Sequence, residues 1–259
     1  MHEHYYLGID LGQRHDYTAI AVLECGLAFL PGFDFANWTR PTETQYNLRH
    51  LDRLPLGTAY TEVVSRVQSL VASNPLSGCC TVIVDATGVG APVIDLLRKC
   101  RLGCTLIPVT ITAGDSALVT PQGHRVPKRD LIHGLQLMLE QAHLRVAASL
   151  PHAETLVREL LAMRVKISLS GNDLYGAWRE GDHDDLVLAV SLACWRARAV
   201  APSPNRALSL ARQVRMPAGD APTGSPGIHW QGQVLTGQIA PLELHQEIEE
   251  SKRRSTVTK

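Results

Sequence analysis

The chain has no excess of charge of either sign. Its 259 residues carry 25 Lys and Arg side chains and 25 Asp and Glu side chains, so net charge does not favour nucleic acid or any other polyanion as a partner. A phosphate-binding surface must therefore come from local clusters of basic residues. Aromatic residues are scarce, at 5% of the chain, and they do not alternate with basic residues. Base stacking and readout of a nucleotide sequence are therefore not predicted.

Two further absences exclude small cysteine-based modules and membrane segments. The six cysteines include no CxxC pair and no His at zinc-finger spacing, so we expect reduced thiols in place of a zinc module or disulfide framework. No run of about 18 apolar residues occurs, and the start MHEHYYLGID lacks a basic region followed by an apolar run. We therefore expect a cytoplasmic protein with no membrane partner.

Length and composition are those of one good-sized domain with a tail. The chain is 45% hydrophobic and 19% charged, as in a globular protein with a sizeable core. Beyond residue 200 the character changes, because residues 201–259 hold six of the 15 prolines and end in the charged segment ESKRRSTVTK. We predict a folded domain over residues 1–200 and a disordered Pro- and Gly-rich tail over 201–259, with a short helix near 242–252.

The apolar pattern of the first 200 residues predicts a mixture of strands and helices. Two β-rich runs joined by GQRHDY indicate an opening hairpin. A strand at 81–84, a helix at 93–99 and a strand at 106–109 follow one another, which indicates parallel strands joined by a helical crossover. The helix at 184–198 is almost wholly apolar and should be buried on most faces. The other predictions are strands at 5–11, 18–23, 46–51, 165–169 and 174–178, and helices at 60–71, 128–142 and 151–163.

Acidic residues stand at the ends of three of these elements. Asp10 ends the first strand, Asp85 follows the strand at 81–84, and Asp184 and Asp185 begin the last helix. Ligand sites of open α/β sheets lie outside the carboxyl ends of parallel strands, so Asp10 and Asp85 become neighbours if their strands pair. Carboxylates within about 4–6 Å repel one another unless a cation lies between them. The pattern therefore indicates a site for a divalent metal such as magnesium, which prefers oxygen ligands.

Each acid also has a simpler explanation when it is taken alone. Asp10 can be a turn residue, and Asp184 can be a helix N-cap. A helix N-terminus needs one acid, however, whereas the segment GDHDD places Asp182, Asp184 and Asp185 within four residues. We therefore interpret Asp10, Asp85, Asp184 and Asp185 as candidate catalytic and metal-binding residues.

Four segments resemble the successive nuclease motifs of phage terminase large subunits. They appear in the family's order over residues 5–196, and they read GIDLGQRHDYTAIAVLE, VIVDATGVGAPVIDLLR, VPKRDLIHGLQLMLE and YGAWREGDHDDLVLAVSLA. The resemblance implies an α/β fold with a ribonuclease-H-like mixed β-sheet flanked by helices. It also implies a metal-dependent DNA endonuclease that uses two Mg²⁺ or Mn²⁺ ions to hydrolyse phosphodiester bonds of double-stranded DNA.

The resemblance assigns a role to each acid. Asp10 matches the metal ligand of the first strand, Asp85 the ligand after the fourth strand, and Asp185 the ligand on the last helix, with Asp184 as its alternate. Similarity to Holliday-junction resolvases, whose last helix carries acids three residues apart, makes Asp182 a further metal ligand. We expect nearby basic residues to contact DNA phosphates, although each can also be a solvated helix-end charge: Lys128, Arg129, Arg164, Lys166 and Arg179.

One departure from the family is large, because the chain has no GxxxxGK[ST] phosphate-binding loop and so lacks the packaging motor. The resemblance then implies a phage- or prophage-encoded protein of the host cytoplasm that is one of three things: a split terminase with a separate packaging ATPase and a portal as partners, a free-standing prophage-derived nuclease, or a remnant. Three alternatives stay open: a Holliday-junction-resolvase-like nuclease, a catalytically silent adaptor, and an actin-like or sugar-kinase-like ATP-binding protein. The last is suggested by GIDLG, but it requires a second phosphate loop that the domain does not contain.

Overall fold

The computed structural model describes residues 3–12, 16–33, 35, 38, 40–88, 90–167, 173–176 and 183–200. At 164–167 and 173–176 the backbone alone is described. The predicted tail over 201–259, with its predicted helix at 242–252, lies outside the described residues, so this domain division stays a prediction. Within the described part, no helix is both long and apolar enough to cross a membrane.

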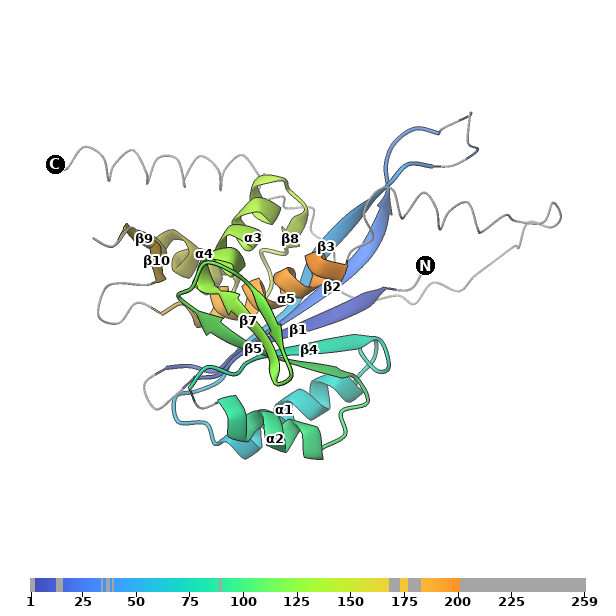
Figure 1. The fold of residues 1–259 in the computed structure, drawn as a ribbon. Helices are drawn as coiled ribbons and strands as arrows, with labels where there is room; N and C mark the ends of the chain where they lie inside the picture. Colours follow the sequence, from blue (N-terminus) through green and yellow to red (C-terminus); the bar gives the residue numbers. More distant parts are fainter. Residues whose placement is uncertain are drawn as a thin grey trace.

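A mixed eight-stranded sheet forms the centre of the molecule (Figure 1), with the strand order β6-β7-β5-β4-β1-β2-β3-β8. β1 (His4–Asp10) pairs antiparallel with β2 (Ala19–Phe29) and parallel with β4 (Cys80–Asp85). The predicted opening hairpin is thus confirmed, and the first and fourth strands are neighbours. The outer strands are β3 (Thr42–Arg53), β5 (Thr105–Thr112), β6 (Leu118–Thr120), β7 (Gly123–Pro127) and β8 (Leu144–Val146).

Helices cover both faces of this sheet (Figure 1). One face carries α1 (Tyr60–Ala72) and α2 (Gly90–Lys99), and α2 joins the parallel strands β4 and β5 as predicted. The other face carries α3 (Lys128–Glu140), α4 (Ala153–Ala162) and α5 (Asp185–Val200). A separate antiparallel pair is formed by β9 (Arg164–Ile167) and β10 (Asp173–Gly176).

The alternation of side chains along β1 separates two hydrophobic cores. Tyr5, Leu7 and Ile9 belong to the core under α1 and α2, whereas Tyr6 belongs to the core around α5. Successive strand residues point to opposite faces, so Asp10 lies on the α5 face. The same alternation applies to β4, where Ile83 belongs to the α5 core and Asp85 follows it on the same face. The acids that end both strands therefore share one face of the sheet.

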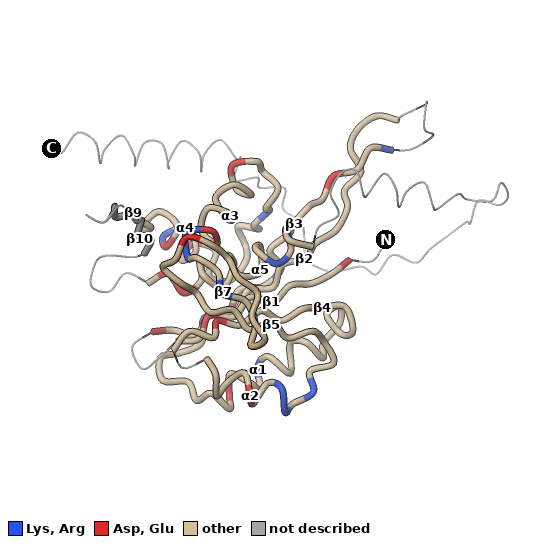
Figure 2. Tube along the Cα trace, viewed as in Figure 1, with Lys and Arg blue, Asp and Glu red and all other residues tan. Residues whose placement is uncertain are grey.

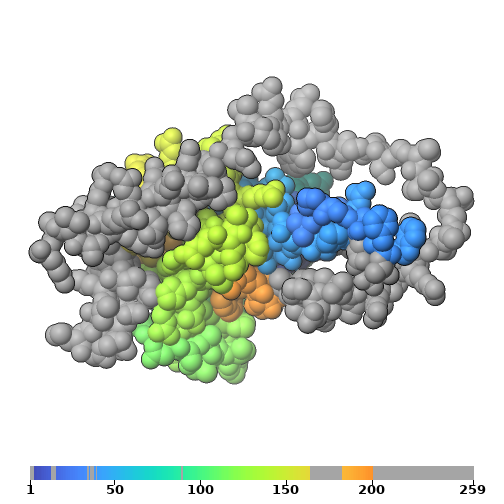
Figure 3. All heavy atoms as spheres, turned by 90° about the horizontal axis from the view of Figure 1, so that it is seen from above, coloured from blue at the N-terminus to red at the C-terminus, as the bar shows by residue number. Residues whose placement is uncertain are grey.

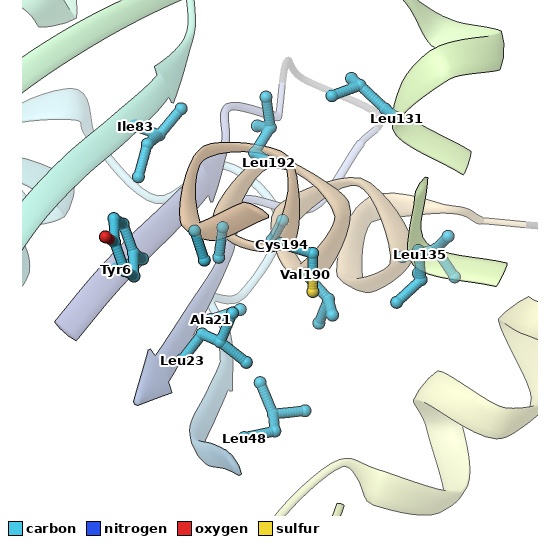
Figure 4. Close-up of a cluster of buried hydrophobic side chains, with 14 of the residues drawn as sticks. Tyr6, Ala21, Leu23, Leu48, Ile83, Leu131, Leu135, Val190, Leu192 and Cys194 are labelled. Atoms are coloured by element: carbon cyan, nitrogen blue, oxygen red, sulfur yellow. The ribbon is translucent and has the colours of Figure 1, made fainter. Parts of the chain in front are cut away.

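α5 is buried along most of its length. Figure 4 shows apolar side chains from strands and helices surrounding it, and the fully buried Leu192 belongs to α5 itself. Burial of one such leucine contributes about 1.5–3 kcal/mol. The helix approaches β1 at Gly8, where a Cβ atom would lie 1.9 Å from the carbonyl oxygen of Ala189. Residue 8 must therefore be glycine for α5 to lie at this depth.

Some element boundaries differ from those expected. The strands β6, β7 and β8 were not predicted, because runs of three to five residues carry little periodicity. The helix expected from residue 151 begins at Ala153, because His152 adopts a left-handed backbone conformation with φ of 64°. β2 and β3 extend further than the predicted runs and form a hairpin that projects from the body (Figure 1, Figure 3).

This projecting hairpin carries all three phenylalanines of the chain, Phe29, Phe33 and Phe35, together with Trp38. Phe35 and Trp38 are 77% and 79% exposed. The ring of Phe33 packs edge-on against both of them, with centroid distances of 5.1 Å and 6.0 Å. Few charged positions occur along the hairpin (Figure 2). It lies at the end of β2 opposite Ala19, the partner of Asp10.

Candidate active site

Four of the predicted carboxylates lie close enough to act on one another. Asp10 and Asp85 end the adjacent parallel strands β1 and β4, and the charge of Asp85 acts on the Asp10 carboxyl. Asp184 and Asp185 stand at the start of α5, and their charges act on Asp10 together with that of Asp85. The folding of three separate elements thus brings Asp10, Asp85, Asp184 and Asp185 within electrostatic reach of one another.

The electrostatics of the cluster are unfavourable for several negative charges at once. Asp10 is 7% exposed, and burial raises its carboxyl pKa well above its usual range. The charges of Asp85, Asp185 and Asp184 raise the pKa of Asp10 further, and Lys128 opposes them. Burial also raises the pKa of Asp85 and of Asp185. A cation placed among these carboxylates would relieve both the desolvation and the repulsion.

The turn after β4 holds Asp85 in a defined position. The backbone N–H of Thr87 donates to Asp85 Oδ1 at 2.8 Å, and Thr87 Oγ1 accepts from the backbone N–H of Ile111 at 2.9 Å. At Gly90 a Cβ atom would lie 2.5 Å from the Asp85 carbonyl oxygen, so the strand-to-helix turn requires glycine. Thr87 therefore fixes the Asp85 carboxylate, and Gly90 lies close against the end of β4.

Basic side chains contact the two acids of α5. Lys128 Nζ lies 2.6 Å from Asp184 Oδ2, so Lys128, which was predicted as a phosphate contact, also belongs to the carboxylate cluster. Arg53 Nη2 lies 2.9 Å from Asp185 Oδ2. His183, which the sequence offered either as a ligand or base or as a surface histidine beside acids, places its Nδ1 3.6 Å from the same oxygen.

Two residues at this site, Arg53 and Glu159, were not predicted from the sequence. Glu159 is 6% exposed on α4, and its Oε1 lies 3.5 Å from Arg53 Nη2. The sequence pattern could have identified Glu159, because it follows Ala153 and Leu156 at a spacing of three residues and so lies on the same helix face. An acid on an apolar helix face is unusual enough to indicate a buried polar role. No comparable sequence pattern distinguishes Arg53.

Of the other predicted residues, Arg129 alone has a described side chain, and it contacts acids outside this cluster. Arg129 forms ion pairs with Asp115 and Asp130, at 3.3 Å and 3.6 Å. Arg164 and Lys166 lie on β9, where the backbone alone is described. The remaining two predicted residues, Asp182 and Arg179, lie outside the described residues.

The donor set around Asp10 consists of carboxylate oxygens, which suit hard divalent cations such as Mg²⁺ and Mn²⁺. Within the described ranges, no three Asp, Glu, His or Cys side chains lie at the mutual spacing of a preassembled metal site. The contacts with Lys128 and Arg53 account for one oxygen each of Asp184 and Asp185. The residues present therefore fit a divalent cation in the chemistry of their oxygen donors, and basic side chains hold Asp184 and Asp185.

The chain is similar in structure to several solved proteins, although its sequence matches no protein-family model and no curated protein. One is the nuclease domain of the large terminase subunit of bacterial virus Sf6, at 14% identity and a TM-score of 0.50, covering 74% of this chain and 87% of that one. A variant of the same Sf6 subunit, solved with calcium, gives 13% identity and a TM-score of 0.52, covering 74% and 88%.

A third similar structure is the large terminase nuclease from the thermophilic phage G20c with bound magnesium, at 24% identity and a TM-score of 0.49, covering 75% of this chain and 82% of that one. At these identities the fold is the shared property, and the two Sf6 structures carry that comparison. The fold predicted from the sequence is thereby confirmed. The chain has the ribonuclease-H-like α/β fold of the nuclease domains of phage terminase large subunits.

Proposed function

We propose that the chain is a divalent-cation-dependent endonuclease that hydrolyses phosphodiester bonds of double-stranded DNA. The observation that carries this proposal is the convergence of Asp10, Asp85, Asp184 and Asp185 from β1, β4 and α5, which raises the pKa of the buried Asp10 carboxyl. The shared fold supports it, as do the calcium and manganese found with variants of the Sf6 large terminase subunit.

In this proposal, Asp10 and Asp85 hold two Mg²⁺ or Mn²⁺ ions together with Asp185 or Asp184, and Asp182 is a further ligand. The bound ions would activate the attacking water and neutralise charge on the leaving oxygen. The chain's own residues orient the site: the N–H of Thr87 fixes one oxygen of Asp85. Lys128, whose Nζ contacts Asp184, places a positive charge beside the position that a DNA phosphate would take.

The proposed DNA contacts are made to phosphates and do not read the base sequence. We assign them to basic residues around the cluster and on neighbouring elements, since the chain has no net positive charge: Lys128, Arg129, Arg164, Lys166 and Arg179. A packaging ATPase and a portal are further proposed partners, in the host cytoplasm, because the chain shares the fold of terminase nuclease domains.

Incubation with supercoiled plasmid in Mg²⁺ or Mn²⁺ tests the proposal. We expect nicked and then linear DNA, inhibition by EDTA, and no cleavage by Asp85→Asn. The matched control is Asp95→Asn on α2, whose carboxylate is 66% exposed and pairs with Arg98 at 3.4 Å. This control should cut like the wild type. If the wild type leaves the plasmid supercoiled with either ion, or if Asp85→Asn cuts as fast as the wild type, the proposal is wrong.

A further inference from the structure

A buried polar network surrounds Asp185 on the side away from β4. Arg53 Nη2 donates to Asp185 Oδ2 at 2.9 Å, and the same nitrogen lies 3.5 Å from Glu159 Oε1. The guanidinium carbon lies 3.9 Å from the ring centroid of Tyr17, so one face of the cation is covered by an aromatic ring. The Arg53 side chain is 14% exposed. Its charge is therefore directed to the two carboxylates more than to solvent.

Glu159 links this network to the helix that carries Asp185. Its Oε2 accepts hydrogen bonds from the backbone N–H groups of Leu186 and Val187, at 2.9 Å and 3.2 Å. The first N–H groups of a helix have no partner within the helix, and a carboxylate there also interacts favourably with the helix dipole. A residue on α4 thus supplies the N-terminal cap of α5.

The strand register places Arg53 in line with the carboxylate cluster. Asp10 pairs with Ala19, and Ala19 pairs with Arg53, so these three positions form one row across β1, β2 and β3. Directly opposed residues of antiparallel strands share a face. Two strand spacings of about 4.8 Å separate Arg53 from Asp10. Because the Ala19 side chain between them is small, the start of α5 can lie above it. Arg53 therefore approaches Asp185 from the flank opposite to Asp85.

We propose that Arg53 and Glu159 are positioning residues that hold Asp185 for cation binding, an inference that rests on the proposed function. Glu159 fixes the first turn of α5, and Arg53 holds Oδ2 of Asp185, which leaves Oδ1 to the carboxylate cluster. Neither residue touches the substrate in this proposal. Within the described structure, Arg53 Nε and Glu159 Oε1 have no hydrogen-bond partner. Arg53 therefore contacts both acids through Nη2 and does not form a bidentate ion pair with either of them.

The test measures binding of Mn²⁺ alone by isothermal titration calorimetry, in the wild type and in Arg53→Lys, Arg53→Gln and Glu159→Gln. Glu159→Gln keeps an oxygen that can accept from α5 but removes the charge that faces Arg53. Partners that orient a metal ligand typically change affinity by about 10- to 100-fold. We expect a loss of Mn²⁺ affinity in this range for Arg53→Gln and Glu159→Gln, and a smaller loss for Arg53→Lys.

Two controls separate positioning from general stability. Arg66→Gln removes another Arg–Asp pair, the contact of Arg66 Nε with Asp52 at 2.7 Å, and should leave Mn²⁺ affinity unchanged. Leu156→Val loosens the buried face of α4 without touching the polar network. This variant should lower the melting temperature but not the Mn²⁺ affinity. In plasmid cleavage the positioning variants should lower kcat at saturating metal, with little change in KM for DNA.

The outcomes distinguish this inference from the proposed function. If the wild type binds Mn²⁺ and cuts DNA, but folded Arg53→Gln and Arg53→Lys bind Mn²⁺ as tightly as the wild type, the positioning role is wrong and the nuclease stands. The same conclusion follows if Leu156→Val also loses Mn²⁺ affinity, in proportion to its lower melting temperature, as the positioning variants do. If the wild type neither binds Mn²⁺ nor cuts DNA, both are overturned. Should Glu159→Gln fail to fold, the two Arg53 variants decide.

Discussion

Gly8 of β1 lies directly against the carbonyl oxygen of Ala189 in α5, and a Cβ atom at residue 8 would lie 1.9 Å from that oxygen. Both contacting groups are backbone, so neither can rotate away as a side chain would. The depth at which α5 sits on the sheet depends on this contact. Because β1 ends in Asp10 and α5 begins with Asp185, the same contact also sets how closely the two acids approach.

Gly8→Ala should therefore destabilise the fold and weaken cation binding together. Overpacking of a well-packed core costs about 1–3 kcal/mol, and here α5 must shift to accommodate the new methyl group. We expect a lower free energy of unfolding by denaturant and a lower Mn²⁺ affinity. The control is Gly26→Ala in β2, where the nearest atom to a new Cβ is Glu3 Cγ at 3.8 Å. Equal unfolding free energies for the two variants would contradict the argument.

The raised pKa of Asp10 predicts that the metal-free protein loses stability as pH rises. The folded state binds this proton more tightly than the unfolded chain does, because burial and three neighbouring acids raise the pKa of the folded-state carboxyl. The contribution of the protonated Asp10 carboxyl to the free energy of unfolding is complete below its ordinary pKa of 3.8. This contribution declines as pH rises toward the raised pKa of the folded state. Asp10→Asn removes this dependence.

Thermal unfolding of the wild type and Asp10→Asn in EDTA, over a series of pH values, checks this prediction. The variant should melt higher than the wild type by a few degrees at neutral pH, since about 1 kcal/mol corresponds to roughly 2–4 °C in a domain of this size. The gap should narrow as pH falls. The variant should also fail to cut plasmid. A gap that is constant across pH would show that the charge of Asp10 does not cause it.

Lys128 should contribute to the salt dependence of DNA binding. Its Nζ donates a hydrogen bond to Asp184 at the carboxylate cluster. Loss of one phosphate contact reduces the slope of the logarithm of DNA affinity against the logarithm of salt concentration by about 1. With Ca²⁺ in place of Mg²⁺, we expect Lys128→Ala to bind double-stranded DNA more weakly and with a smaller slope. Arg98→Ala at the end of α2, with a 55% exposed side chain, should keep the wild-type slope. An unchanged slope in Lys128→Ala would remove it from the phosphate contacts.

The sequence predicted those parts of the site that depend on local pattern. A β-branched run followed by Asp85, and an apolar helix headed by Asp185, are visible in the printed residues. The parallel pairing of β1 with β4 places the strand ends of Asp10 and Asp85 side by side, as expected. The contacts of Lys128 with Asp184 and of Arg53 with Asp185 could not be predicted. The two residues of the first contact are 56 positions apart in the sequence, and those of the second are 132 positions apart. Local periodicity in a sequence does not predict contacts over such separations.

The short strands were missed for a different reason. β6, β7 and β8 have three to five residues each, and they are strands because neighbouring strands pair with them. β7, for example, pairs in parallel with β5, from Val109 with His124 to Thr112 with Pro127. Tertiary pairing of this kind overrides weak local preference. The projecting end of the β2–β3 hairpin was missed similarly, because cross-strand pairing continues into a segment of mixed polar and apolar residues.

The position of α5 in the chain has a consequence for biosynthesis. A ribosome would complete β1, with Asp10, and β4, with Asp85, well before it adds the helix that contributes Asp184 and Asp185. Until that helix emerges, one face of the central strands stays uncovered and the acids of β1 and β4 lack their counterparts. A nascent or prematurely terminated chain that stops short of α5 would therefore carry an incomplete carboxylate cluster, and any cleavage activity would arise only after most of the domain has been translated.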